Sequence, residues 1–151
     1  MSRTSVRWLD RTQQEVWRRY LAGVARINVL LDEALRPFDL GLGEYEILVR
    51  LSESPQWQMR MSDLADATSQ SRSRLTHTVS RMEAKGLISR APCPHDRRGV
   101  IACLTQEGMD LLTEAAPTHV ESVRAALVDV VDPEDFKALG RAMAAVVQVA
   151  D

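Results

Sequence analysis

The chain has few cysteines and few aromatic residues, and it lacks any long apolar run. Its two cysteines, Cys93 and Cys103, are too few for the disulfide framework of a small secreted protein. No stretch approaches the ~18 apolar residues of a membrane span, and the polar N-terminus MSRTSVRWLDR has no signal-peptide segment. We therefore expect a cytoplasmic protein without a membrane partner, folded as one domain over residues 1–151.

Catalytic and metal-binding motifs are also missing. The sequence has no glycine-rich phosphate loop, no nucleophile elbow and no carboxylate pair in a recognisable motif. Serines such as Ser73 and Ser80 lie near His77, but along one exposed helix face without a buried acid to orient the histidine. Cys93, His95 and Cys103 have no evident fourth metal ligand. We expect no enzyme activity, no metal and no cofactor.

The small net charge of −2 conceals a basic segment in the middle of the chain. Residues 60–98 hold eight basic residues against four acidic ones, whereas residues 99–151 hold three against nine. Residues 1–59 hold eight of each sign. A basic segment on a neutral-to-acidic protein is typical of local nucleic-acid binding. From charge alone, a solvated face without a partner is an equally good interpretation.

Hydrophobic spacing predicts long helices at both ends of the chain. Residues 12–36 carry apolar side chains at intervals of three and four, and Pro37 ends that helix. A second long helix is expected over 106–131, kinked by Pro117. The sequence Asp132-Pro133-Glu134-Asp135 is a strong start for the last helix, because it combines a cap, a first-position proline and acidic residues.

The middle of the chain predicts two short helices followed by a hairpin. Ser62 is expected to cap a helix that ends near Ser69, and a second helix runs from about Ser71 to Lys85, where Gly86 ends it. This spacing is that of a helix-turn-helix.

Two strands are expected after the second helix. Residues 87–90 and 99–104 have strand-like sequences, and residues 91–98 between them are too many for a tight turn and end in basic residues. A hairpin with an extended charged tip is a wing.

A helix-turn-helix followed by a basic wing indicates DNA binding. A helix fits the major groove when the side chains on its outer face are short or polar and carry positive charge. The outer face expected here comprises Ser71, Arg72, Ser73, Arg74, Thr76, His77 and Arg81. A second cationic side chain enters the narrow minor groove, a role that Arg97 or Arg98 at the wing tip can fill.

Residues 61–108 resemble the winged-helix core of the multiple-antibiotic-resistance regulator (MarR) family. The resemblance rests on the helix opening Ser62–Leu64–Ala65, the helix ending Glu83–Lys85–Gly86–Leu87, the wing motif Asp96-Arg97-Arg98, and Leu104-Thr105 followed by Gly108. It implies that the second motif helix reads the major groove, that Arg98 enters the minor groove, and that Asp96 holds the wing by pairing with an arginine. Gly43 stands where the family often has a serine or threonine cap.

The resemblance implies a mainly α protein with a small β-wing, built as a winged helix-turn-helix lobe over 44–104 with dimerisation helices over 12–36 and 106–150. The terminal helices carry more apolar side chains than a monomer of this size would cover, and a monomeric helical bundle is the alternative. The interface residues expected are Val16, Phe136, Leu139, Met143, Val146 and Val147. Two-fold symmetry would place two recognition helices about one DNA turn apart, ~34 Å, on a palindrome.

The expected function is therefore a homodimeric regulator of transcription, a repressor on a palindromic operator that a small phenolic or aromatic ligand releases. Trp17, Tyr20, Tyr45 and His119 are the candidates to line an effector pocket, with an ordinary core or interface role as the alternative for each. Two other interpretations stay open: a winged-helix protein-interaction module, and a redox-sensing regulator that uses Cys93 or Cys103.

Overall fold

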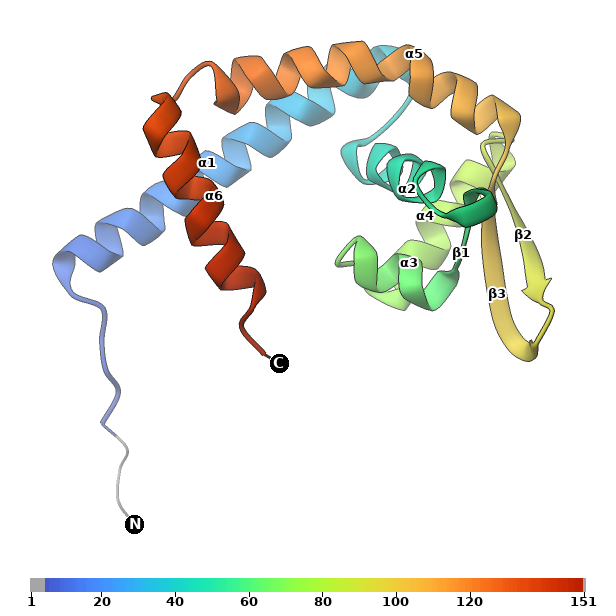
Figure 1. The fold of residues 1–151 in the computed structure, drawn as a ribbon, viewed down its shortest axis with the longest axis horizontal. Helices are drawn as coiled ribbons and strands as arrows, with labels where there is room; N and C mark the ends of the chain where they lie inside the picture. Colours follow the sequence, from blue (N-terminus) through green and yellow to red (C-terminus); the bar gives the residue numbers. More distant parts are fainter. Residues whose placement is uncertain (1–4, 151) are drawn as a thin grey trace.

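Three long helices project from a small lobe in the computed structural model, which describes residues 5–150. The helices are α1 (Arg11–Leu35), α5 (Gln106–Val123), which continues as a π-helical turn over Arg124–Val128, and α6 (Pro133–Val147). Figure 1 shows α1 and α5 running side by side away from the lobe, with α6 following at the far end of α5. We refer to α1, α5 and α6 as the arm helices. Among the described residues, none of the helices is long and apolar enough to span a bilayer.

The lobe contains three shorter helices and a sheet, and we call α2 through β3 the winged lobe. Its elements are α2 (Leu42–Ser52), β1 (Gln58–Arg60), α3 (Met61–Ala67), α4 (Arg72–Ala84), β2 (Ile88–Cys93) and β3 (Asp96–Leu104), with short 3-10 turns at Arg36–Phe38 and Pro55–Trp57. The sheet is antiparallel in the order β1-β3-β2. The mainly α winged-helix fold expected from the sequence is confirmed.

Helix boundaries agree with the sequence expectation except at two places. The helix expected to start at the cap Ser62 begins at Met61, because β1 runs directly into α3, and the extended Arg60 at the cap position makes no side-chain capping bond. Pro117 lies inside α5, as expected, and the second difference is the π-helical turn at Arg124–Val128, within the helix expected over 106–131. The N-cap expected at Asp132 is present, since its side chain accepts the N–H of Glu134.

The start of α2 is stabilised by side chains from elsewhere. Gly41, and not Gly43, occupies the cap position. Glu44 Oε1 accepts the N–H of Gly41 at 3.1 Å, and Asp32 Oδ1 from α1 accepts the N–H of Leu42 at 2.9 Å. These carboxylates satisfy the N–H groups of the cap residue and of the first helical residue, so the helix start is stabilised without a serine or threonine cap.

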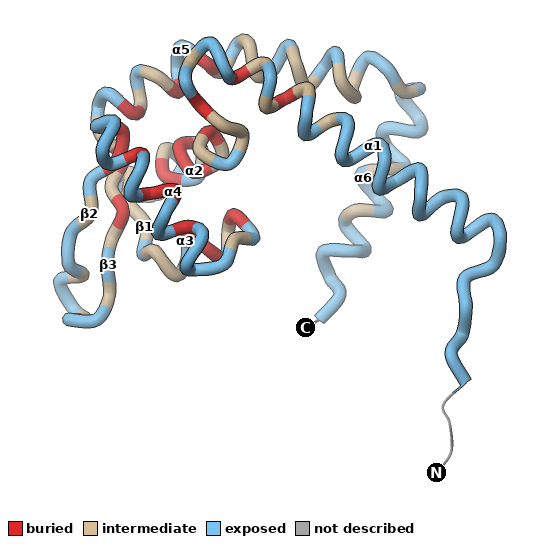
Figure 2. Tube along the Cα trace, turned by 180° about the vertical axis from the view of Figure 1, so that it is seen from behind, coloured by how far each residue is buried: buried red, intermediate tan, exposed pale blue. Residues whose placement is uncertain are grey.

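The hydrophobic core lies inside the winged lobe and at its junction with α1 and α5. Figure 2 shows the buried residues gathered there, while the distant parts of the arm helices are exposed. The core comprises Leu35, Leu40, Tyr45, Ile47, Leu48, Leu51, Leu64, Ala65, Leu75, Val79, Met82, Leu87, Ile88, Ala102, Leu104, Leu112 and Ala115. None of these residues belongs to α6. The lobe therefore has a core of its own.

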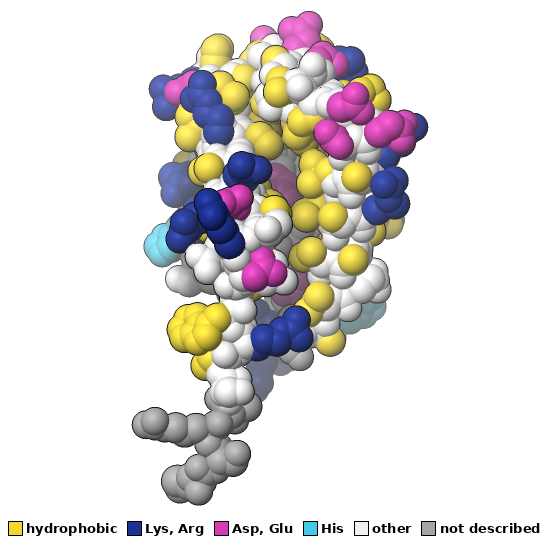
Figure 3. All heavy atoms as spheres, turned by 90° about the vertical axis from the view of Figure 1, so that its left-hand side faces the viewer, with side chains coloured by type: hydrophobic (Ala, Val, Ile, Leu, Met, Phe, Trp, Pro, Cys, Tyr) yellow, Lys and Arg dark blue, Asp and Glu magenta, His cyan; other side chains and the backbone are white. Residues whose placement is uncertain are grey.

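The far halves of the arm helices expose large apolar side chains. No residue of α6, all of which the structure describes, is buried. Val16 and Trp17 on α1 are 58% and 51% exposed, and Val146 on α6 is 59% exposed. Figure 3 shows apolar side chains facing one another across the space between the two helices. A groove between α1 and α6 is lined almost wholly by apolar atoms, and Leu9, Val16, Trp17, Tyr20, Met143 and Val146 form it.

A close contact at Gly108 joins α5 to the winged lobe. The Thr105 side chain caps α5 by accepting the Gly108 N–H at 3.0 Å, and its hydroxyl donates to the Gly86 carbonyl at 2.6 Å. A Cβ added at Gly108 would lie 2.3 Å from the Leu87 carbonyl oxygen and 2.6 Å from Leu104 Cδ1. Only glycine allows the helix to lie this near the strand backbone.

We expect Gly108→Ala to lower the free energy of unfolding by about 1–3 kcal/mol, the usual cost of overpacking, despite the better helix propensity of alanine. Chemical denaturation measures the change. Gly23→Ala in α1 is the matched control, since its Cβ would meet nothing within 4 Å, and it should leave stability unchanged or raise it. Equal stability of the two variants would contradict the proposed close packing at Gly108.

Candidate nucleic-acid interface

The N-cap of helix α4 and its buried residues can both be recognised in the sequence. Ser71 is the N-cap, and its hydroxyl accepts the N–H of Arg74 at 3.2 Å. Leu75, Val79 and Met82 are buried against the lobe, as expected from their spacing. This anchoring leaves the opposite side of α4 free, and all seven predicted contact residues on this helix are exposed.

The exposed residues of α4 divide among three directions. Ser73 and His77 lie opposite the buried side of the helix. Arg72 and Thr76 line a cleft between α4 and the β2–β3 hairpin, whereas Arg74 lines a second cleft with residues of α1 and α2. The seven predicted residues are therefore not equivalent, because their positions around the helix direct them to different surroundings.

The β2–β3 hairpin, which we call the wing, is longer and tighter than the sequence indicated. Pairing continues to Cys93 and Asp96, so the turn holds only Pro94 and His95 in place of the eight-residue tip expected over 91–98. Strand β2 lies at the edge of the sheet, where a proline needs no partner for its missing N–H. Pairing therefore passes Pro92, with an irregularity between Pro92 and Cys93.

Asp96 connects the wing to β1. Its Oδ1 accepts the backbone N–H of Arg98 at 3.0 Å, and its Oδ2 lies 3.5 Å from Arg60 Nη2. The arginine that pairs with Asp96 is thus Arg60, which sequence reasoning did not single out. The two residues are 36 positions apart, and only the antiparallel pairing of β1 with β3 brings them together. No local pattern in the sequence marks this pair.

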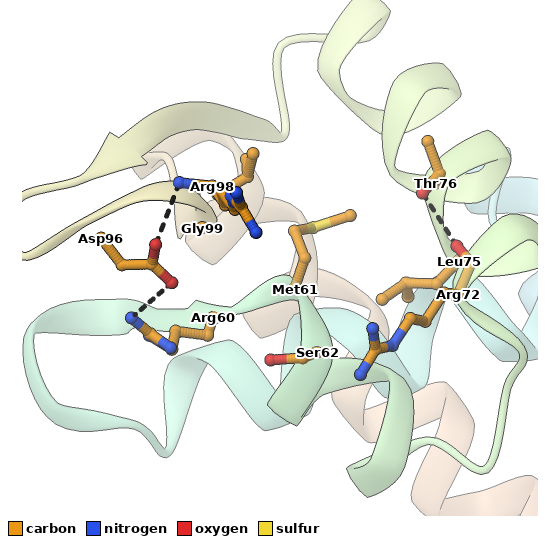
Figure 4. Close-up of a pocket in the computed structure, with 10 residues that line it drawn as sticks. Arg60, Met61, Ser62, Arg72, Leu75, Thr76, Asp96, Arg98 and Gly99 are labelled. Carbon is orange, nitrogen blue, oxygen red and sulfur yellow. Dashed lines mark hydrogen bonds and ion pairs between the residues drawn. The ribbon is translucent and has the colours of Figure 1, made fainter.

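A cleft of about 390 Å³ separates α4 from the wing. Figure 4 shows Arg98 on the wing side and Arg72 on the α4 side, with Met61 and Ser62 between them and Arg60 beside Asp96. Arg97, the other candidate at the wing, does not line this cleft. Three guanidinium groups against the single carboxylate of Asp96 make the cleft cationic, which suits an anionic chain such as a nucleic-acid backbone.

The four candidate effector residues form two separate pairs. Trp17 and Tyr20 stack with ring centroids 5.6 Å apart in the apolar groove between α1 and α6. Tyr45 and His119 lie 4.2 Å apart, at the junction of α2 and α5. The sequence places Trp17 and Tyr20 on one helical stripe, but it does not show how that stripe lies relative to Tyr45 and His119.

His119 is the unusual member of the second pair. Its Nδ1 is buried and has no hydrogen-bond partner among the described residues, and burial lowers the pKa of its ring. The ring lines a cleft of about 480 Å³ together with Tyr45, Leu31, Leu42 and Val49. Glu46, Arg50 and Glu53 line the same cleft, so aromatic rings and charged groups lie together there, as suits a small aromatic molecule with a polar group.

The two cysteines are free and have different hydrogen-bond partners. Cys93 accepts a hydrogen bond from Arg60, whereas the thiol of Cys103 lies 3.6 Å from the Gln58 side-chain oxygen. Within residues 5–150 no group of three or more histidine, cysteine or acidic side chains is arranged to hold a metal ion.

Comparison with known proteins identifies the family. The MarR family profile matches residues 38–99. AbsC, a MarR family transcriptional regulator from Streptomyces coelicolor, is 45% identical, with 95% of this chain and 97% of AbsC covered and a TM-score of 0.88. The chain belongs to the MarR family. This family consists of transcriptional regulators and not of enzymes.

Two further relatives extend the comparison. The MarR family regulator Sco3205 of Streptomyces coelicolor, crystallised in complex with DNA, is 40% identical with a TM-score of 0.91, covering 96% of this chain and 91% of Sco3205. The regulator PecS of Dickeya dadantii is 31% identical over 106 residues, which are 67% of this chain and 64% of PecS. The matched part thus spans just under two thirds of the length of PecS.

The partial burial of His119 predicts that the protein is less stable in acid. Because burial lowers its pKa in the folded protein, the unfolded chain takes up the proton at higher pH than the folded protein does. The contribution of His119 is therefore fully present above the unfolded pKa of about 6.5 and is lost as the pH falls below that value. We expect the unfolding free energy to decrease in this range, and His119→Gln to make the decrease shallower.

Denaturant titrations from pH 7.5 to 5 measure this slope. His77→Gln is the matched control, because His77 lies exposed on α4. An unchanged slope in His119→Gln, or an equal change in His77→Gln, would show that His119 does not cause the acid sensitivity.

Proposed function

We propose that this MarR family member is a sequence-specific DNA-binding repressor that acts as a homodimer. Helix α4 enters the major groove through Ser73 and His77, and Arg98 reaches the adjacent minor groove. The observation that supports this proposal most directly is the cationic cleft between α4 and the wing, with Arg72 on one side and Arg98 on the other. The relative Sco3205 was crystallised in complex with DNA, which supports DNA binding as the function.

The hydroxyl groups on α4 give this proposal chemical detail. Thr76 Oγ1 donates to the Arg72 carbonyl at 2.8 Å, and Ser80 Oγ donates to the Thr76 carbonyl at 2.8 Å. With their hydrogens committed to the helix backbone, these two oxygens face the groove as acceptors. They suit amino groups of adenine or cytosine, while Arg72 and Arg81 suit phosphates or guanine.

The homodimer is supported by the unpartnered apolar faces of α1 and α6. Phe136, Val146 and Val147 are 38%, 59% and 77% exposed, and Leu139 and Met143 are only partly buried. Contiguous exposure of this kind marks an association surface. A second copy related by a two-fold axis covers it with the same helices and sets two α4 helices on the half-sites of a palindrome.

Effector control belongs to the same proposal. A small phenolic or aromatic ligand in the cleft beside Tyr45 and His119 would act at the junction of α2 and α5, where the winged lobe meets the arm helices. The rings of Tyr45 and His119 line this cleft and suit an aromatic ligand. Binding there biases the orientation of α4 relative to the arms, and hence the spacing of the two α4 helices.

The first test is Arg98→Ala. We expect it to weaken binding to the operator, sought upstream of the protein's own gene, by about 1–3 kcal/mol, since it removes a minor-groove contact without touching the arms. Arg97→Ala is the matched control and should have the smaller effect, because Arg97 does not line the cleft. Titrations by fluorescence anisotropy at two salt concentrations measure both variants.

A loss confined to Arg97→Ala would transfer the minor-groove role to the neighbouring residue. Unchanged affinity in both variants would remove the wing from the mechanism. A wild-type protein with no preference for any specific duplex, at any salt concentration, would favour the alternative of a protein-interaction module.

The second test concerns assembly. Met143→Asp puts a charge into the apolar groove between α1 and α6, and we expect the dimer to weaken at least about tenfold because an unpaired buried charge costs several kcal/mol. The winged lobe should stay folded, as its core contains no α6 residue. Ala138→Asp adds the same charge on the opposite, exposed side of α6 and should leave the dimer intact.

Analytical ultracentrifugation over a range of concentrations gives the dimer dissociation constant, and anisotropy gives operator affinity. A Met143→Asp protein that remains dimeric would argue against this interface. One that is monomeric yet equally tight on the full palindrome would separate DNA binding from dimerisation.

A further inference from the structure

Arg60 occupies a place that neither α4 nor the wing accounts for. It is the last residue of β1 and pairs with Ile101 of β3, so beyond this point the wing continues as two strands without the third. Two-stranded ribbons hold their shape poorly by themselves. The part of the wing that carries Arg98 therefore needs another support.

The Arg60 side chain provides contacts to that part of the wing. One nitrogen, Nη2, lies 3.3 Å from Cys93 Sγ on β2 and 3.5 Å from Asp96 Oδ2 on β3. The other oxygen of Asp96 accepts the backbone N–H of Arg98. Among the described residues, these two contacts of Arg60 are the side-chain hydrogen bonds that join residues 91–100 to the rest of the protein.

The position of Cys93 is itself tightly set. A Cβ added at Gly99 would lie 3.1 Å from Cys93 Cβ and 3.3 Å from Asp96 Oδ2, so the two strands approach closely where the thiol and the carboxylate meet. Hydrogen bonds from the His95 backbone and from the Arg60 side chain lower the pKa of the Cys93 thiol. The sulfur is thus a hydrogen-bond acceptor beside the guanidinium.

We infer that Arg60 is a positioning residue for Arg98, and that Cys93 and Asp96 together hold its guanidinium as a latch between β1 and the wing. The latch fixes the position of the Arg98 backbone at the edge of the cleft, opposite Arg72 (Figure 4). It gives Cys93 a role as a hydrogen-bond acceptor in the wing. The inference rests on the proposed DNA binding, and it assigns positioning roles to Arg60, which lines the cleft, and to Cys93, which does not.

Operator affinity provides the first test. Arg60→Met keeps the length of the side chain and removes its charge, and we expect affinity to fall by up to about fivefold, the largest effect typical of an exposed ion pair. In an Arg98→Ala background the same substitution should change affinity less than twofold, because the residue that it positions is gone. Arg50→Met is the matched control, as Arg50 is an exposed arginine that pairs with Glu46 on α2, and it should have no effect.

A direct phosphate contact by Arg60 would give a different result. The loss would persist in the Arg98→Ala background, and the slope of log affinity against log salt would decrease by about one contact. That outcome overturns the positioning role. Thermal denaturation of each variant checks that any loss of binding does not come from unfolding.

Cys93 provides the second test, independent of DNA. In a Cys103→Ser protein the single thiol is alkylated with iodoacetamide across pH 6–10, and the rate follows the thiolate fraction. Arg60→Met should move this profile to higher pH, whereas Arg50→Met should leave it in place. An unshifted profile overturns the latch. Failure of the wild-type protein to bind any operator would overturn the proposed function, and with it the role of Arg98, while the alkylation profile still decides whether Arg60 contacts Cys93.

Discussion

The contact between the start of α5 and the start of β2 is the constraint on which the rest of the structure depends. Gly108 lets the helix backbone lie against the Leu87 carbonyl, and Thr105 ties the same point to Gly86. On one side of this contact lie α4 and the wing, and on the other side lie the arm helices. This contact is made of backbone groups and has no room for a side chain. It therefore fixes the start of α5 relative to the end of α4.

This arrangement separates two kinds of stability. The winged lobe buries its own apolar residues and needs no second chain to do so. The arm helices, in contrast, hold their apolar residues at their far ends, where nothing within the described chain covers them. In the proposed dimer, the arms of two chains cover one another, and the separation between the two α4 helices depends on how those arms pack. The cleft beside Tyr45 and His119 lies where the two parts meet, so the proposed ligand would act on DNA binding without contacting DNA.

The wing shows how a small protein holds an extended cationic side chain in place. Arg98 cannot be supported by burial, since a residue that reaches into a groove must be exposed. Its backbone is held instead by Asp96, and Asp96 is held by Arg60 from the neighbouring strand. Each bond is modest in water, but a two-stranded ribbon has few alternatives, so small interactions decide the direction of its tip.

The sequence by itself determined those features that local interactions control. Apolar spacing located the arm helices, Ser71 and Asp132 marked the starts of α4 and α6, and the exposed polar side of α4 followed from its expected buried positions. Only the tertiary structure decided the rest. The short wing turn depends on β2 being an edge strand, the separation of Trp17 and Tyr20 from Tyr45 and His119 depends on how the helices pack, and Arg60 meets Asp96 through strand pairing across 36 residues. Contacts between distant residues leave no periodic or neighbouring signal in one sequence, because their geometry exists only once the intervening chain has folded.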